Sequence, residues 1–267
     1  MRVLFIGDIV GAPGRQMVRD RLMDTVTQQK IDLVIANGEN SAAGFGITPK
    51  LAEEFLRGGI DVLTGGNHSW DRREIMEFMP HEPRLLRPAN FPDGSPGGGL
   101  FLGTTKSGAK YAVLNLQGRI FLPAIDDPFR KAESELAKLP GDVTFVLVDM
   151  HAETTSEKIA MGWFLDGRVT AVVGTHTHVT TADERVLPGG TAYITDVGMT
   201  GPHAGVIGMD RQGIVKKFLD GLPARFEVAS GDVQMNAVLI ETDDEGPRNE
   251  AGRLRAKSIA RMRLRID

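Results

Sequence analysis

The first eighty residues repeat one pattern three times: a short apolar segment, a loop and a segment with helical spacing. The apolar segments are Val3–Ile6, Leu33–Ala36 and Val62–Thr64, and the helices are predicted over 15–29, 49–57 and 72–79. Short runs that are apolar throughout are typical of strands buried on both faces. Alternation of such strands with helices implies parallel pairing, right-handed crossovers and helices outside the sheet. The repeat therefore predicts an α/β fold.

The second half of the chain predicts a mixed rather than a purely parallel arrangement. Two hairpins are expected, one around the turn Ser107-Gly108 and one around Pro188-Gly189-Gly190. The remaining predictions are strands over 144–149, 170–175, 233–241 and roughly 258–266, and helices over 128–139 and 156–165. No internal repeat and no Pro/Ser/Gly-rich linker divides the chain. We therefore expect residues 1–267 to form one domain.

Composition limits the class of protein. With no cysteine among 267 residues, a disulfide scaffold, a cysteine nucleophile and a thiolate metal site are excluded. The net charge of −4 argues against a non-specific nucleic-acid binder, and the locally basic run 248–265 is interpreted as a charged face. No stretch approaches the ~18 apolar residues of a membrane span, and the N-terminus lacks the pattern of a signal peptide. We expect a cytoplasmic protein without a stable nucleic-acid partner.

Side chains with oxygen or imidazole donors follow each of five predicted strands. They are Asp8, then Glu39 and Asn40, then Asn67 and His68, then His151, and finally His176 and His178. Each has an ordinary explanation when taken alone, such as helix capping or a buried histidine. The carboxyl ends of strands in an α/β sheet line one edge, however, so all of these side chains should meet there. Their joint position predicts a metal site.

The number of donors points to more than one ion. A single zinc ion takes three or four protein ligands, so six or seven candidates indicate two ions about 3.5–4 Å apart with a bridging carboxylate. Oxygen and imidazole donors suit manganese, iron or zinc. Ligand types alone leave the choice among these metals open.

These motifs resemble those of the calcineurin-like metallophosphoesterases. Members have an Asp after the first strand, an acidic turn after the second, Gly-Asn-His after the third, a lone His and a final His-x-His. This sequence departs from the usual pattern at two points, because no histidine follows two residues after Asp8 and Glu39 replaces an aspartate. Both departures, and the stretches 37–42 and 195–202, are similar to a bacterial subgroup, the YmdB-like phosphodiesterases. The resemblance implies a four-layer α-β-β-α sandwich with two mixed β-sheets flanked by helices, and a homo-oligomer.

The resemblance also implies roles for individual residues. One ion would be held by Asp8, Glu39, Asn40 and His178, and the other by Glu39, Asn67, His151 and His176. Iron or manganese is expected at these positions, with zinc as the alternative. The implied reaction is hydrolysis of a phosphodiester, in particular a 2′,3′-cyclic nucleotide. A hydroxide bridging the two ions would attack phosphorus, and His68 would act as general acid.

Other interpretations remain at this point. The same site could serve a phosphomonoesterase, or a metal-binding regulator with little turnover, although the spare histidine His68 argues against the latter. A barrel-type amide hydrolase is disfavoured because its His-x-His motif usually follows the first strand. His81 is expected at the surface, and His203 has no assigned role beyond contact at the rim. Phe45, Trp70 and Phe121 lie on loops where they could stack on a base, but packing is the favoured explanation for each.

Overall fold

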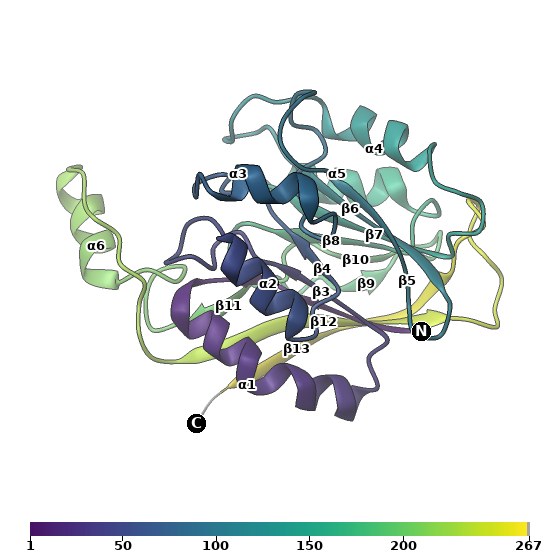
Figure 1. Cartoon of the computed structure of the whole chain (residues 1–267), viewed down its shortest axis with the longest axis horizontal. Coiled ribbons are helices and arrows are strands. Elements are labelled where there is room, and N and C mark those ends of the chain that lie inside the picture. Colours follow the sequence, from purple (N-terminus) through teal and green to yellow (C-terminus); the bar gives the residue numbers. More distant parts are fainter. Residues whose placement is uncertain (266–267) are drawn as a thin grey trace.

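The structure is a computed structural model that describes residues 1–265 (Figure 1). Its strands are β1 Arg2–Ile6, β2 Asp8–Ile9, β3 Leu33–Asn37, β4 Val62–Thr64, β5 Leu100–Thr104, β6 Lys110–Gln117, β7 Phe145–His151, β8 Ala171–Thr175, β9 Arg185–Val186, β10 Ala192–Ile194, β11 Met199–Pro202, β12 Val233–Asp243 and β13 Arg255–Arg265. Its helices are α1 Gly11–Gln29, α2 Pro49–Arg57, α3 Ile75–Phe78, α4 Pro128–Leu136, α5 Thr155–Leu165 and α6 Arg211–Asp220, with a 3₁₀ helix over Met79–His81.

The strands form two mixed sheets. The first has the order β2-β11-β12-β1-β3-β4, with β13 paired to β12, and the second has the order β5-β6-β7-β8-β10-β9. Neighbours are parallel where helices connect them, as in β1/β3/β4 and β6/β7/β8. The hairpins β5/β6 and β9/β10 are antiparallel, and β12 runs antiparallel to β1 and β13. Both sheets therefore place the carboxyl ends of their parallel strands at an edge.

The two sheets pack against each other, and helices cover their outer faces. Phe5 and Ile35 of the first sheet share one buried cluster with Leu147 and Val173 of the second. A separate cluster joins the outer face of the first sheet to α1 and α2, and another joins the second sheet to α4 and α5. Alternation along each strand produces this division, because neighbouring side chains point to opposite faces. The predicted four-layer α-β-β-α sandwich is confirmed (Figure 1).

Most predicted helices and strands are present, but several begin or end at other residues than predicted. The helix predicted over 72–79 is reduced to α3, and the 3₁₀ helix contains Pro80, which has no N–H to continue an α-helical ladder. The helix α1 begins at Gly11, four residues before the predicted start. The last strand begins at Arg255, earlier than predicted, and Ile266 lies outside the described residues. Among the helices of residues 1–265, none is both long enough and apolar enough to cross a membrane.

Three elements were not predicted from the sequence. The strands β2 and β11 pair with each other in parallel over only two residues each, too few to produce a pattern in the sequence. The helix α6 buries only Ile214, so its apolar residues do not have the spacing of a core-facing helix. Figure 1 shows α6 projecting away from the two sheets.

Candidate metal centre

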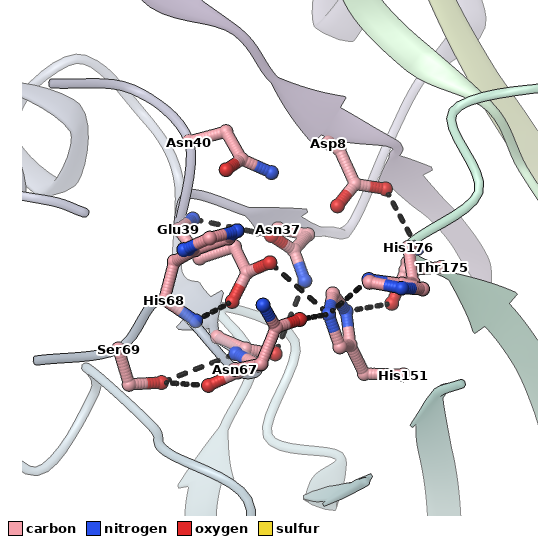
Figure 2. A network of polar contacts seen from close by, with 12 residues as sticks. Asp8, Asn37, Glu39, Asn40, Asn67, His68, Ser69, His151, Thr175 and His176 are labelled. Atoms are coloured by element: carbon pink, nitrogen blue, oxygen red, sulfur yellow. Dashed lines mark hydrogen bonds and ion pairs between the residues drawn. The ribbon is translucent and has the colours of Figure 1, made fainter. Parts of the chain in front are cut away.

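Contacts at the carboxyl ends of the strands connect all eight predicted site residues into one cluster. Figure 2 labels all of them except His178. Asp8 lies in β2 directly after β1, and His151 is the last residue of β7. The loops after β3, β4 and β8 supply the remaining side chains, which are Glu39, Asn40, Asn67, His68, His176 and His178. Residues up to 170 positions apart in sequence (Asp8 and His178) thus meet at one edge, as the strand-end pattern predicts.

Glu39, His151 and His176 form the compact half of the cluster. One donor atom from each lies within 4.8 Å of the others, which is a geometry suited to a metal ion. The Nε2 atom of His151 lies 3.0 Å from Glu39 Oε1 and 2.9 Å from the side-chain oxygen of Asn67. The Nδ1 atom of His176 lies 3.1 Å from the same His151 nitrogen. Four side chains therefore direct donor atoms to one point.

The second half of the cluster is built around His178. Its Nε2 atom lies 3.1 Å from the side-chain nitrogen of Asn40 and 3.8 Å from Asp8 Oδ1. An amide can turn its oxygen toward the same point, since the two ends of the Asn40 carboxamide have nearly the same shape. The other carboxylate oxygen of Asp8 accepts a hydrogen bond from the backbone N–H of His176 at 3.2 Å. This contact joins the two halves.

Hydrogen bonds leave one ring nitrogen of each histidine ligand free to face the centre. His178 Nδ1 donates to the backbone carbonyl of Ile207 at 2.9 Å, and His176 Nε2 lies 3.0 Å from the Glu153 carboxylate. His151 Nδ1 is 2.9 Å from the hydroxyl of Thr175. A histidine that donates one N–H to a fixed acceptor presents its other nitrogen as a metal ligand in a set orientation.

One buried carboxylate oxygen lacks a hydrogen-bond partner. Asp8 Oδ1 is inaccessible to solvent and receives no hydrogen bond, and it lies 3.8 Å from His178 Nε2. Such an oxygen is costly to bury unless a donor or cation compensates it. Glu39 Oε1 is equally buried and faces His151 Nε2 at 3.0 Å. Two buried carboxylates beside three imidazoles fit a site for cations that prefer oxygen and nitrogen ligands. The residues present therefore fit the metal centre that the sequence predicts.

Burial and mutual charge shift the pKa values in this cluster. Burial raises the pKa of Asp8. Burial also disfavours charge on Glu39, but the neighbouring His151 and His68 outweigh it and lower the Glu39 pKa to about 2. Burial opposes charge on His151 as well, yet Glu39 and Asp8 raise its pKa to about 9, whereas burial and His151 lower the pKa of His176 to about 3. Glu39 and His151 therefore form a buried ion pair, in which the proton on His151 occupies the place that a bound cation would take.

Asp149 supports the His151 ring through the hydroxyl of Thr175. This residue was not identified from the sequence. The hydroxyl of Thr175 donates to Asp149 Oδ1 at 2.8 Å, and the hydroxyl of Thr64 donates to Oδ2 at 2.5 Å. Burial raises the pKa of Asp149 to about 7. A chain of contacts from Asp149 through Thr175 thus fixes the His151 ring. The sequence did contain a sign of this role, because a carboxylate within a strand that is otherwise as apolar as β7 is rarely without a partner.

Asp196 and Lys158 support the His176-Thr177-His178 turn. Asp196 accepts hydrogen bonds from the backbone N–H and the hydroxyl of Thr177, at 3.1 and 2.8 Å. Lys158 Nζ lies 2.6 Å from the same carboxylate, and both side chains are almost completely buried. His176 and His178 have φ angles of 101° and 64°, which are uncommon for residues other than glycine. The buried ion pair therefore stabilises the turn that presents both imidazoles.

His68 lies beside the cluster and contacts Glu39 through its backbone. Its backbone N–H donates to Glu39 Oε2 at 3.0 Å, while its ring Nδ1 lies 2.7 Å from Asp71 Oδ2. The ring of Phe45 packs edge-on against His68 with centroids 5.2 Å apart. With Nδ1 held by Asp71, Nε2 is the nitrogen left for a reacting group, and the side chain is 26% exposed. Sequence reasoning identified His68 but not Asp71.

The remaining expectations for histidines and aromatic residues have clear structural outcomes. His81 is exposed, as predicted. His203 lies at the rim, where its ring nitrogens contact the Gly201 carbonyl and the Asn236 side chain. Trp70 packs against Phe91, in agreement with a packing role, whereas Phe121 is 87% exposed and does not have one.

Comparison with known proteins identifies the family. A family model described as "YmdB-like protein" matches residues 4–254. A 2′,3′-cyclic-nucleotide 2′-phosphodiesterase of Bacillus subtilis (strain 168) is 52% identical over 245 residues, which is 92% of each chain. Two crystal structures have closely similar folds: a hypothetical protein from Thermus thermophilus (TM-score 0.89, 39% identity, 99% of both chains) and a novel phosphatase of Mycoplasma pneumoniae (TM-score 0.90, 33% identity, 99% of this chain and 93% of that one). The chain belongs to the YmdB-like family and is a hydrolase with the metallophosphoesterase fold.

Proposed function

We propose that this chain is a dinuclear metal-dependent phosphodiesterase whose substrate is a 2′,3′-cyclic nucleotide. The observation that carries the proposal is the pair of half-sites that share one edge, each with a buried carboxylate that faces an imidazole nitrogen. The Bacillus subtilis relative, which acts on 2′,3′-cyclic nucleotides, supports the choice of substrate.

The proposed ligand sets follow the two halves of the cluster. Asp8, Asn40 and His178 would hold one ion, Asn67, His151 and His176 would hold the other, and Glu39 would bridge them. The donors are oxygen and imidazole nitrogen only, so iron or manganese is the proposed pair, with zinc as the alternative. When bound there, the cations would withdraw charge from the phosphate oxygens and lower the pKa of the attacking water.

His68 would supply the proton that the leaving oxygen needs. Asp71 lies 2.7 Å from Nδ1 and orients the ring, which leaves Nε2 to serve the leaving oxygen. A positioned acid of this kind contributes ~10²–10⁴ in rate. Because the hydrogen bond from His68 to Glu39 comes from the backbone N–H, which an alanine retains, replacement of His68 should spare the metal ligands.

Three alanine variants test these roles together. We expect His68→Ala to lower kcat by about 10²–10⁴ while both metals remain bound, and His176→Ala to lose an ion and all activity. His81→Ala is the matched control, since His81 is exposed and away from the cluster. Turnover of 2′,3′-cyclic AMP, bis-p-nitrophenyl phosphate and p-nitrophenyl phosphate, with elemental analysis of each variant, provides the measurement.

The outcomes separate the proposal from its competitors. Loss of metal in His68→Ala would make His68 a ligand rather than an acid. Preference for p-nitrophenyl phosphate over the diesters would favour a phosphomonoesterase. Stable metal binding without turnover of any of the three compounds would favour a regulatory protein.

A further inference from the structure

A cavity of about 630 Å³ adjoins the candidate metal centre on the side of His178. It is lined by the loop that carries His178, by the segment with His203, and by the ends of β12 and β13. Asn236 of β12 and Arg263 of β13 are direct cross-strand partners, so their side chains share one face of the first sheet. The volume is within the range of ligand sites and leaves space beyond a single hydrolysed phosphate.

Three charged side chains line this cavity, and within residues 1–265 one of them forms no ion pair. Arg261 and Glu184 form an ion pair at 2.8 Å, and each compensates the other. Arg263 lies two residues further along β13 on the same face as Arg261, and it is the one without an ion pair in the described part of the chain. The polar lining near Arg263 includes the Asn236 amide and the His203 ring, which contact each other at 3.1 Å.

We propose that this cavity is a subsite for a second phosphate of the substrate, bound by Arg263. A guanidinium is well suited to bidentate binding of phosphate, and Arg263 lines the same cavity as His178, which belongs to the candidate metal centre. The substrate class is then a cyclic nucleotide that carries a further phosphate. That phosphate is either a 5′-phosphate on the same nucleotide or the next phosphodiester of an oligonucleotide. The inference rests on the proposed phosphodiesterase function.

Arginine on an edge strand also has an ordinary explanation, since charges protect edge strands from pairing with other chains. Lys257 and Arg265 of β13 fit that explanation because they are exposed and do not line the cavity. Arg263 is also exposed, but it differs from them because it lines the cavity that His178 lines as well. Lys257 therefore offers a matched control on the same strand.

The test compares three substrates that share one cyclic phosphate. They are 2′,3′-cyclic AMP, its 5′-phosphorylated form, and a dinucleotide ending in a 2′,3′-cyclic phosphate. In the metal-loaded wild type, we expect a second phosphate to raise kcat/KM about tenfold or more, chiefly through a lower KM, because the contact is the same in ground and transition states. The ratio of kcat/KM with a second phosphate to kcat/KM without it should fall to about one in Arg263→Ala and stay unchanged in Lys257→Ala.

Salt provides a readout that a structural role of Arg263 would not affect. The slope of log kcat/KM against log salt should be steeper by about one for a substrate whose second phosphate contacts Arg263, and this difference should vanish in Arg263→Ala. An advantage limited to the 5′-phosphorylated mononucleotide, or to the dinucleotide, identifies the source of the phosphate.

The possible failures are distinguishable. Equal kcat/KM for all three substrates in an active wild type, or an advantage that persists in Arg263→Ala, would overturn the subsite. Inactivity on all three would instead overturn the proposed function. In that case calorimetry on the metal-loaded protein compares adenosine 3′-phosphate with adenosine 3′,5′-bisphosphate, and equal affinities in wild type and Arg263→Ala would also reject the subsite.

Discussion

Gly66 precedes Asn67 and lies against the ring of His151. A Cβ placed on Gly66 would stand 2.2 Å from ring atoms of His151, which is far inside contact distance. The ring cannot retreat freely, because Thr175 and Asp149 fix its other side. The glycine of the Gly-Asn-His motif is therefore required by a packing contact at the site.

Gly66→Ala should displace His151 and weaken the metal centre. Overpacking of this kind typically costs about 1–3 kcal/mol, so the fold should persist while metal content and turnover fall. Elemental analysis, circular dichroism and hydrolysis assays measure the three effects. Gly98→Ala is the matched control, since a Cβ there meets no atom within 4 Å. Full metal content in Gly66→Ala would show that the His151 ring can move aside without loss of the metal.

For single residues, the sequence identified the side chains that face the candidate metal centre. It did not identify the residues that support those side chains through hydrogen bonds. Asp8, Glu39 and His151 stand beside strand ends, where their position alone indicates a function. Asp149 and Asp196 act through hydroxyls and backbone groups of other segments, and no spacing in the sequence links them to His151 or Thr177. Such supporting contacts depend on which loops the fold brings together.

Among the elements, α6 stands out only for how little it packs on the rest of the chain, since Ile214 is its one buried residue. Phe218 and Leu219 are 85% and 83% exposed, and the helix stands away from the sheets (Figure 1). Large apolar side chains that lie next to each other in solvent are typical of contact surfaces between proteins. The family resemblance predicts a homo-oligomer, and α6 is the element we expect to take part in it.

A double substitution tests this expectation. Phe218→Ser with Leu219→Ser should lower the mass measured by light scattering, because both side chains would leave a contact between copies. The circular dichroism spectrum should be unchanged, since neither side chain is buried within one chain. Lys216→Ser, also exposed on α6, serves as the control. An unchanged mass in the double variant would place the contact elsewhere or exclude an oligomer.

The strongly patterned elements were predicted and the short ones were not. The segments Pro49–Arg57 and Val62–Thr64 have the predicted bounds, because proline at a helix start and glycines after a strand act locally. The strands β2 and β11 exist only through their pairing, which joins residues about 190 positions apart. Local sequence carries no information about such a pairing.

In the whole molecule, one core connects the two sheets. Phe5 and Ile35 from the first sheet and Leu147 and Val173 from the second belong to the same buried cluster. Neither sheet could expose that face to water without losing the burial of its apolar side chains, worth about 25 cal/mol per Å². We therefore propose that the chain folds as one domain, as the absence of a linker predicts.

The two tryptophans offer a direct test, because they report on different layers. Trp70 packs with the cluster outside the first sheet, and Trp163 lies on α5 outside the second. We expect Trp70→Phe and Trp163→Phe variants to show urea transitions with the same midpoint, since each retains a fluorophore on one layer. A comparison with the circular dichroism transition of each variant controls for changes in stability. A fluorescence midpoint that differs from the circular dichroism midpoint of the same variant would indicate two domains.

The sequence by itself determined the α/β class, the positions of most strands along the chain and the eight side chains at their carboxyl ends. These features are local, since they follow from apolar runs, glycine and proline stops, and polar residues at strand ends. Tertiary structure alone decided that Thr175 and Asp149 fix His151, that Lys158 and Asp196 stabilise the turn His176-Thr177-His178, and that Arg263 and His178 line one cavity. Each of these contacts joins segments far apart in the chain, and their relative placement is set by how two sheets pack over a common core.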